Sequence, residues 1–436
     1  MLDRRTFLGA LALPAAAPVL APRWAAPHAV SEALEEIDEL ARGASSPQAA
    51  ARDETLWARA QDAFTPDRSL INFNNGGVSP APRKVQEAHQ AYLEHANQAP
   101  AYIMWRIQEP KKETIRARLA KLFGADAEEI AITRNASESL QTCQFGFDLE
   151  PGDEVLTTNQ DYPRMLTTFR QRERREGIVL REISIPVPLT DPSEVVRRFE
   201  EAITDRTRMI LMCHVVNLTG QVQPVREVVE LGRRRGIPVV VDGAHAFAHL
   251  VFQRDELGCD YYGTSLHKWL FAPFGTGLLY VRREKIGDLW PLMAAHDELE
   301  ADIRKFEQIG THPVPLILSI AEALTFHESL GAENKLARMT YLRDRWAERL
   351  AQHDRVRLNT NLAQGMAGGI ANVRIDGVES GELARYLWKE HKILVTVIKH
   401  DEFEGLRVSP SVYSTLDEVD RFADAMEAVV KDGLPS

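Results

Sequence analysis

An uninterrupted apolar segment that ends in an aspartate is the feature of this sequence that most constrains its fold. Residues 237–241, IPVVV, contain no polar side chain, and Asp242 follows them directly. A strand that is apolar on both faces is typical of a parallel sheet covered by helices on each side. Ligands of such sheets gather beyond the carboxyl ends of the strands, so we expect Asp242 to contact one.

The segments around this strand predict an α/β fold. A strand at 208–216 and a helix that begins near Pro224 and ends at Gly236 precede it. The other predicted elements are strands at 129–133, 153–157, 179–183, 260–264 and 277–281, a long helix at 317–353, and a tail with strands at 370–375 and 393–397 and helices at 380–391 and 415–430. The tail predicts a separate α+β lobe.

These elements divide the chain into four predicted parts. They are an export signal at 1–25, a helical lead-in at 26–70, a large domain with a mainly parallel sheet at 71–320, and a smaller C-terminal domain at 321–436.

The overall charge and the cysteine count limit the classes of function. With 436 residues and a formal net charge of −11, the chain lacks the basic face that nucleic acid or anionic lipid requires. Three cysteines are too few for a disulfide framework. No HExxH or CxxC metal motif and no GxxxxGK[ST] phosphate loop occurs. Small-molecule chemistry without a metal is therefore the class we expect.

The first residues resemble an export signal. Arg4 and Arg5 stand just before an apolar run, rich in Ala, Leu and Pro, that continues to Ala21. The arginine pair resembles the twin-arginine translocation signal, whose pathway moves folded proteins. Pro14 and Pro18 interrupt a stretch that is shorter than the roughly 20 residues of a membrane-spanning helix. We expect export through the twin-arginine machinery, to the periplasm or beyond, without stable membrane insertion.

Two segments carry the residues expected to do chemistry: VVVDGAHAFAH at 239–249 and YGTSLHKWL at 262–270. Pyridoxal 5′-phosphate (PLP) requires a lysine that forms a Schiff base and a carboxylate that keeps the ring nitrogen protonated, which makes the ring an electron sink. Lys268 and Asp242 match these two roles. Taken singly, Asp242 fits a solvated turn or a helix cap, and Lys268 fits a surface lysine after a strand.

Together, the two segments closely resemble the class V aminotransferase family, which includes isopenicillin N epimerase-like proteins and cysteine desulfurases. The resemblance runs from about residue 71 to the C-terminus. It implies the fold type I of PLP-dependent enzymes, with PLP on Lys268 as a Schiff base and its pyridine nitrogen on Asp242. It also places His245 near the 3-hydroxyl of the cofactor, although His245 fits a helix cap as well.

The same resemblance implies a phosphate site. ITRNASESL at 132–140 resembles the phosphate loop of the family, with Ala136 and Ser137 at a helix N-terminus that faces the anion. Ordinary helix capping is the alternative for this segment. Ser265 and His267 match the phosphate contacts that precede the family lysine. Gly310 and Thr311 resemble the segment that a second subunit contributes, which implies a homodimer.

Ring and substrate contacts are also implied by resemblance. Tyr162 in DYPRM falls where the family stacks a side chain on the ring, and Asn217 in HVVNLTGQ matches an asparagine that reaches the cofactor hydroxyl or the substrate carboxylate. A core tyrosine and a turn asparagine are the alternatives. Arg407 in GLRVSP occupies the position that binds the α-carboxylate, or else is a solvated strand arginine. Asn75 in NNGG belongs to a loop that approaches the substrate.

The residues do not decide among PLP reactions, because one electron sink serves transamination, epimerisation, decarboxylation and elimination. Desulfurases of the family carry a nucleophilic cysteine shortly before the carboxylate arginine, whereas the last cysteine here, Cys259, precedes Lys268. We expect aminotransferase-type chemistry on an amino acid or a peptide-bound amine outside the cytoplasm. An epimerase or a cysteine-independent lyase or decarboxylase is the second candidate, and an exported binding protein without catalysis is the third.

Overall fold

The computed structural model describes residues 28–435. The predicted export signal at 1–25 lies outside the described residues. Within residues 28–435, every helix is too short or too polar to span a membrane.

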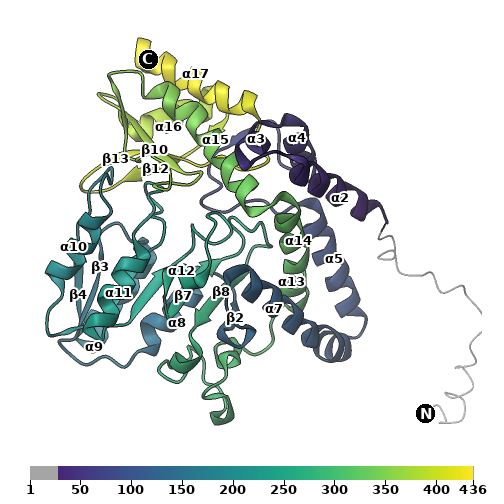
Figure 1. The fold of residues 1–436 in the computed structure, drawn as a ribbon, viewed down its shortest axis with the longest axis vertical. Helices are drawn as coiled ribbons and strands as arrows, with labels where there is room; N and C mark the ends of the chain where they lie inside the picture. Colours follow the sequence, from purple (N-terminus) through teal and green to yellow (C-terminus); the bar gives the residue numbers. More distant parts are fainter. Residues whose placement is uncertain (1–27, 436) are drawn as a thin grey trace, which may run out of the picture.

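Helices make up the larger share of the elements (Figure 1). The α-helices are α2 (His28–Gly43), α3 (Pro47–Arg52), α4 (Glu54–Asp62), α5 (Arg83–Gln98), α6 (Pro100–Tyr102), α7 (Lys112–Phe123), α8 (Ala136–Gly146), α9 (Pro163–Glu176), α10 (Ser193–Ala202), α11 (Val225–Arg235), α12 (Arg254–Leu257), α13 (Val314–Leu318), α14 (Ile320–Leu330), α15 (Ala332–Leu350), α16 (Ser380–His391) and α17 (Leu416–Asp432). Short helical segments of other types are η2 (Ile103–Gln108), η3 (Glu109–Lys111), η4 (Ala127–Glu129), η5 (Arg283–Lys285), η6 (Asp297–Leu299) and η7 (Ile303–Glu307).

A seven-stranded sheet forms the centre of the large lobe, in the order β2-β8-β7-β6-β5-β3-β4. Its strands are β2 (Ile130–Thr133), β3 (Glu154–Thr158), β4 (Val179–Ile183), β5 (Thr207–Cys213), β6 (Val239–Asp242), β7 (Tyr261–Ser265) and β8 (Gly277–Val281). Only β8 runs antiparallel to its neighbours; the remaining pairs are parallel. The expected mainly parallel sheet is therefore confirmed.

Both faces of this sheet are buried, which explains the uninterrupted apolar strands. On β6, Val239 and Val241 join the hydrophobic cluster on one face, and Val240 joins the cluster on the other. Leu211 and Met212 on β5 divide between the same two clusters. Consecutive strand residues point to opposite faces, so a strand in the middle of three layers needs apolar residues at every position.

The smaller lobe follows the large domain in the chain and lies above the sheet in Figure 1. Its four-stranded antiparallel sheet has the order β12-β13-β10-β9, and β1 pairs in parallel with β11. These strands are β1 (Ile71–Asn72), β9 (Val356–Leu358), β10 (Ala371–Ile375), β11 (Ile393–Leu394), β12 (Thr396–Lys399) and β13 (Glu404–Val408). The predicted α+β lobe is confirmed, and β1 joins it from the far end of the sequence.

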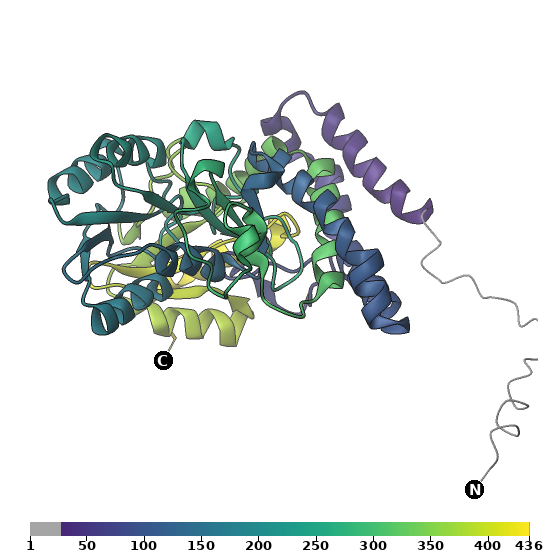
Figure 2. The same cartoon turned by 90° about the horizontal axis from the view of Figure 1, so that it is seen from below.

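The lead-in segment is packed into the molecule. Helices α2 to α4 lie beside α14 and α15, and α2 is the purple helix at the edge of the molecule in Figure 2. Trp57 of α4 is fully buried in a cluster that includes Trp269 and Phe271, close in sequence to Lys268. The guanidinium of Arg338 lies 5.4 Å from the ring centre of Trp57. This segment therefore supports the backbone next to the predicted catalytic lysine.

Two predicted elements are wrong. The strand expected at 393–397 is divided into β11 and β12, which belong to different sheets. The single long helix expected at 317–353 is instead three helices, α13, α14 and α15. Gly331 separates the last two with a φ of +76°, in the left-handed region that favours glycine. Phe326 and Leu330 of α14 and Met339 of α15 lie in one shared hydrophobic cluster, so apolar residues continue across the break and conceal it in the sequence.

Candidate active site

The ends of three neighbouring parallel strands bring the central residues together. Cys213 on β5 pairs in register with Asp242 on β6, and Asp242 pairs with Gly263 on β7. Lys268 lies in the turn that follows β7. A glycine follows Asp242 because the Tyr262 ring packs against the backbone there: a Cβ on Gly243 would lie 1.9 Å from that ring. The strand-end position predicted for Asp242 is thus the position that the structure gives it.

Asp242 is a buried carboxylate without a cationic hydrogen-bond partner among the described residues. Its Oδ1 accepts one hydrogen bond, from the backbone N–H of Ala244 at 2.9 Å. Burial raises the pKa of Asp242 to about 6, against the lowering effects of that hydrogen bond and of Lys268. An ionised carboxylate in such a place is costly unless a cationic group binds it. A protonated ring nitrogen of a ligand would satisfy it.

Lys268 lies in the same site, and its charge interacts with that of Asp242. Its Nζ lies 3.0 Å from Nε2 of His245. Burial lowers the pKa of Lys268 to about 8, although Asp242 opposes the shift. Burial also lowers the pKa of His245 well below the usual range, so the neutral ring accepts a hydrogen bond from Nζ. A lysine amine with a lowered pKa is a better nucleophile and proton acceptor at neutral pH.

His249 fixes the segment that carries His245. Its Nδ1 donates to the backbone oxygen of His245 at 2.7 Å, and its Nε2 accepts from the N–H of Gly369 at 2.7 Å. Its ring stacks on Trp269, with 4.1 Å between ring centres. His249 was not predicted as a site residue, although it lies four residues after His245 in the same segment.

The predicted phosphate loop forms a helix N-terminus at the same edge of the sheet. Asn135 caps α8 by accepting a hydrogen bond from the N–H of Glu138, and α8 begins at Ala136. The N–H of Ala136 donates to Oγ of Ser265 at 2.9 Å, so two predicted phosphate contacts touch each other. Ser137 follows in the first turn and is half-buried. Free first-turn N–H groups are the usual binding site for an anion.

His267 and Thr311 occupy different positions relative to this loop. The half-buried His267 has Nδ1 3.2 Å from the backbone oxygen of Thr276. Burial lowers the pKa of His267, and the charge of Lys268 adds to the effect. Thr311 is exposed on the surface of its own chain. Its predicted contact with the phosphate of a second subunit stays a prediction.

Arg407 is a buried cation without an ion pair among the described residues. Its Nη1 donates to the backbone oxygen of Asn217 at 3.0 Å, and its Nη2 donates to Oδ1 of Asn74 at 2.8 Å and to Oγ1 of Thr396 at 3.3 Å. Its Nε has no partner among the described residues. Burial lowers the pKa of Arg407 to about 10. An anion at this position would remove most of the cost of burying the charge.

The structure gives different contacts to the predicted residues Asn217, Tyr162 and Asn75. Oδ1 of Asn217 is buried and has no partner among the described residues, so it is available to a ligand. Tyr162 is 43% exposed. It lies near enough to Arg407 to raise the pKa of the arginine. The structure places Asn74 against Arg407, whereas the amide of Asn75 is engaged inside the protein. A substrate contact by the Asn75 side chain would therefore require these bonds to break.

Sequence reasoning missed a second buried carboxylate beside the site. Asp161 accepts hydrogen bonds from Oγ1 of Thr157 at 2.9 Å, from Oγ1 of Thr158 at 2.7 Å and from Sγ of Cys213 at 3.1 Å. Burial raises the pKa of Asp161, and its charge adds to the raised pKa of Asp242. These bonds fix the loop that carries Tyr162.

The donor set fits PLP. The site offers an amine, a buried carboxylate for a cationic ring nitrogen, and a helix N-terminus for a phosphate. Sixteen buried side-chain polar atoms have no partner among the described residues, and three of them belong to predicted site residues: Nδ1 of His245, Oδ1 of Asn217 and Nε of Arg407. A polar ligand bound in the site would pair these three atoms.

Comparison with known proteins agrees with this fit. Residues 71–422 match the family described as Aminotransferase class-V. The chain is 30% identical to an isopenicillin N epimerase of Streptomyces clavuligerus over 86% of this chain and 98% of that protein. It is 32% identical to an isopenicillin N epimerase of Amycolatopsis lactamdurans over 86% and 99% of the two chains.

Cysteine desulfurases are more distant relatives. The one from Haloferax volcanii is 24% identical over 82% of this chain and 89% of that protein. Among solved structures, a lysine-to-alanine mutant of C-DES with glycine covalently linked to its PLP cofactor superposes with a TM-score of 0.73 at 22% identity, covering 83% of this chain and 98% of that one. The superposition confirms fold type I.

Proposed function

Because this chain belongs to the class V aminotransferase family of PLP-dependent enzymes, we propose that it acts at the α-carbon of an amino acid or of a peptide-bound amine. The observation that most supports this substrate class is Arg407, a 6% exposed cation whose partners are all neutral. A planar guanidinium binds a carboxylate through two parallel hydrogen bonds. An α-carboxylate at this position would bring its α-carbon into the site that holds Lys268.

Each residue would have a separate task. PLP, when bound, withdraws electrons from the α-carbon and so weakens the bonds of that carbon. Asp242 would hold the ring nitrogen, and Arg407 would orient the substrate through its carboxylate. Nζ of Lys268 would move the proton, since a pKa of about 8 leaves part of the amine unprotonated near neutral pH. His245 accepts a hydrogen bond from Nζ and would keep the amine in position.

Aminotransferase-type chemistry is the first candidate because this site supplies one amine for proton transfer. Epimerisation needs a proton donor on each face of the α-carbon, and Tyr162, partly exposed near Arg407, is the candidate for the second donor. The two epimerase relatives favour this alternative. A desulfurase reaction is disfavoured, because Cys143, Cys213 and Cys259 are all buried and burial raises the pKa of each thiol.

Product analysis distinguishes these reactions. Holoenzyme would be incubated with a panel of amino acids and peptides, with and without a 2-oxo acid, and the products identified by mass spectrometry and chiral chromatography. An aminotransferase consumes the oxo acid; an epimerase inverts configuration without it; a lyase or decarboxylase releases a fragment. Absence of any product across a broad panel, with spectral evidence of binding, would favour the non-catalytic binding protein.

Replacing Arg407 by glutamine should weaken binding of carboxylate substrates about 100-fold or more, because a charge-assisted bidentate contact is lost. The measurement is the spectral titration of holoenzyme with amino acids and with the corresponding amino-acid amides. The amides should respond much less to the substitution. Arg357→Gln is the matched control, since Arg357 pairs with Asp376 at the surface of the same small sheet. An equal loss for amides and acids would contradict the assignment.

We further propose export through the twin-arginine pathway, on the basis of Arg4 and Arg5. Changing both residues to lysine should leave a folded, PLP-loaded precursor in the cytoplasm, because the receptor reads the arginine pair itself. Cell fractionation with detection of the protein and of its absorbance is the measurement. Normal export of the double-lysine variant would contradict the proposal.

The working unit proposed here is a homodimer whose active sites use residues of both subunits. Lys268→Ala and Thr311→Asp should each inactivate the enzyme, yet a heterodimer of the two variants should regain part of the activity. One of its sites would carry both defects and the other neither. Co-expression with two affinity tags isolates the heterodimer. A folded but inactive heterodimer, or an active monomer by light scattering, would contradict the shared site.

A further inference from the structure

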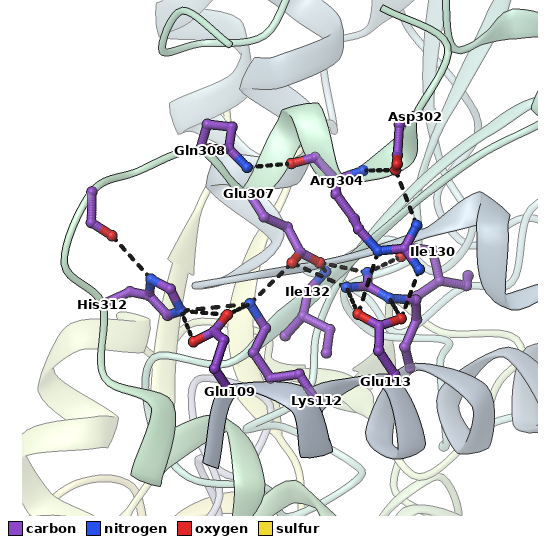
Figure 3. A network of polar contacts seen from close by, with 12 residues as sticks. Glu109, Lys112, Glu113, Ile130, Ile132, Asp302, Arg304, Glu307, Gln308 and His312 are labelled. Atoms are coloured by element: carbon purple, nitrogen blue, oxygen red, sulfur yellow. Dashed lines mark hydrogen bonds and ion pairs between the residues drawn. The ribbon is translucent and has the colours of Figure 1, made fainter. Parts of the chain in front are cut away.

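A network of buried and half-buried charges joins the Gly310–Thr311 turn to the strand that leads into the phosphate loop (Figure 3). It runs from His312 through Glu109 and Lys112 to Glu307. The network lies outside the predicted active-site residues of its own chain, and the PLP-binding roles described above use none of its side chains.

His312 is held at both ring nitrogens. Its Nδ1 lies 2.9 Å from the backbone oxygen of Gly310, and its Nε2 lies 2.9 Å from Oε2 of Glu109. A carbonyl oxygen and a carboxylate can only accept, so the ring makes both hydrogen bonds at once only as the protonated imidazolium. The hydrogen bond from His312 to Glu109 raises the pKa of the imidazole.

Lys112 and Glu307 connect the His312–Glu109 contact to the interior of the protein. Glu109 also accepts from Nζ of Lys112 at 2.8 Å, and Lys112 lies 3.5 Å from His312 and 3.2 Å from Glu307. Lys112 opposes the charge on His312, while Glu109 favours it. Lys112 leads on to Glu307 and Arg116, the next charged groups of the same network.

Glu307 anchors the other end of the network. It accepts hydrogen bonds from Nη1 of Arg116 at 2.6 Å and from the N–H of Ile132 at 2.6 Å. Ile132 belongs to β2, which ends three residues before Ala136 begins α8. One charge network therefore fixes both the start of this chain's own phosphate loop and the turn that is proposed to serve the partner's phosphate.

We propose that protonated His312 is a positioning residue for Thr311, and that it sets how tightly the partner subunit holds the cofactor phosphate. The inference rests on the proposed homodimer with shared sites. The Gly310 position is open: its φ is +74°, and no atom lies within 4 Å of the position that a Cβ would take. The imidazolium closes the turn by bonding to the Gly310 oxygen from one side while Glu109 holds it from the other.

The affinity for the cofactor phosphate should fall as the pH rises. His312 is charged below its raised pKa and loses its charge as the pH rises through that value. Phosphate affinity should therefore be higher at pH 6 than at pH 9 in the wild-type enzyme. His312→Gln carries no charge to pair with Glu109 at either pH, so its affinity should be low at both pH values.

The test uses full-length apoenzyme and 4′-deoxypyridoxine 5′-phosphate, which has the phosphate but no aldehyde, so covalent attachment to Lys268 does not contribute. At pH 6, His312→Gln should bind this probe about three- to tenfold more weakly than wild type, and the two should converge at pH 9. The titration of the probe itself is common to both proteins. His353→Gln, which alters the separate His353–Glu427 pair, should follow wild type throughout.

Probe binding by Thr311→Ala separates a failure of this inference from a failure of the proposed function. If Thr311→Ala weakens probe binding but His312→Gln matches wild type at both pH values, the positioning role is overturned and the shared phosphate site stands. If Thr311→Ala binds as wild type does, the shared site fails and the inference fails with it. Should His312→Gln not fold, Glu109→Gln removes the same charge pair and must reproduce the loss at pH 6.

Discussion

Lys268→Ala is expected to abolish turnover, by about 10⁴-fold or more, while the protein stays folded. The substitution removes both the covalent attachment of PLP and the amine proposed to move the substrate proton, and general acid–base catalysis alone contributes about 10²- to 10⁴-fold. The unfolding free energy should change by only about 1 to 2 kcal/mol, because the lost hydrogen bond to His245 is offset by removal of a buried amine.

Turnover by mass spectrometry and chemical denaturation are the paired measurements for this variant. Lys305→Ala is the matched control, since Lys305 is 2% exposed, donates to the backbone oxygen of Glu300 and lies outside the proposed site. The control should lose stability and keep turnover. Substantial turnover in Lys268→Ala, or loss of turnover only through unfolding, would show that another residue supplies the amine.

Asp242→Asn should have the second largest effect, a loss of about 100-fold or more in kcat, because the ring nitrogen would lose the carboxylate that keeps it protonated. The same substitution should increase the stability of the apoprotein, although it lowers kcat of the holoenzyme. Burial raises the pKa of Asp242 from 3.8 to about 6, so the folded state binds more protons than the unfolded state between these values. Stability therefore falls as the pH rises through this window.

An asparagine carries no charge, so it removes the cost of burying an ionised carboxylate at position 242. Apo Asp242→Asn should therefore be more stable than the apo wild type above pH 6, by about 1 to 3 kcal/mol. Below pH 4 the difference should vanish. Asp260→Asn is the control, because Asp260 pairs with Arg282 just before β7, outside the proposed site, and should leave kcat unchanged. An apo variant that is less stable at pH 8 would indicate that Asp242 is a structural residue.

The central pair was predictable because its signal is local. The apolar run of β6 fixes a buried parallel strand, and the acid at its end follows in sequence. The same holds for the phosphate loop, whose cap and helix start lie within a few residues at Asn135 and Ala136. A strand end and a helix cap depend on residues that are only a few positions apart, so they can be predicted before the fold is known.

Contacts between distant segments were not predictable in the same way. The choice between Asn74 and Asn75 depends on Thr396 and Arg407, which approach the loop from strands more than 300 residues later. The pairing of Asp161 with Cys213 depends on two strand ends that meet only in the folded sheet. In each case the residue types give no signal until the sheet order is known.

The His312 network illustrates a second limit. Its members, from Glu109 to Glu307, are ordinary charged residues of helices and turns, and the sequence does not show that the Glu109–Lys112 pair meets His312 and Glu307. Only the fold shows that a carboxylate and a carbonyl face both nitrogens of one imidazole.

The central claim is that Lys268 holds PLP, and borohydride reduction of the purified holoenzyme tests it most directly. The reagent fixes PLP irreversibly to the lysine that carries it, and peptide mapping by mass spectrometry then locates the adduct. Our account predicts a yellow protein and an adduct on the peptide that contains Lys268, and none in Lys268→Ala. An adduct on any other lysine of the wild-type protein, or no adduct in a PLP-saturated sample, would contradict it.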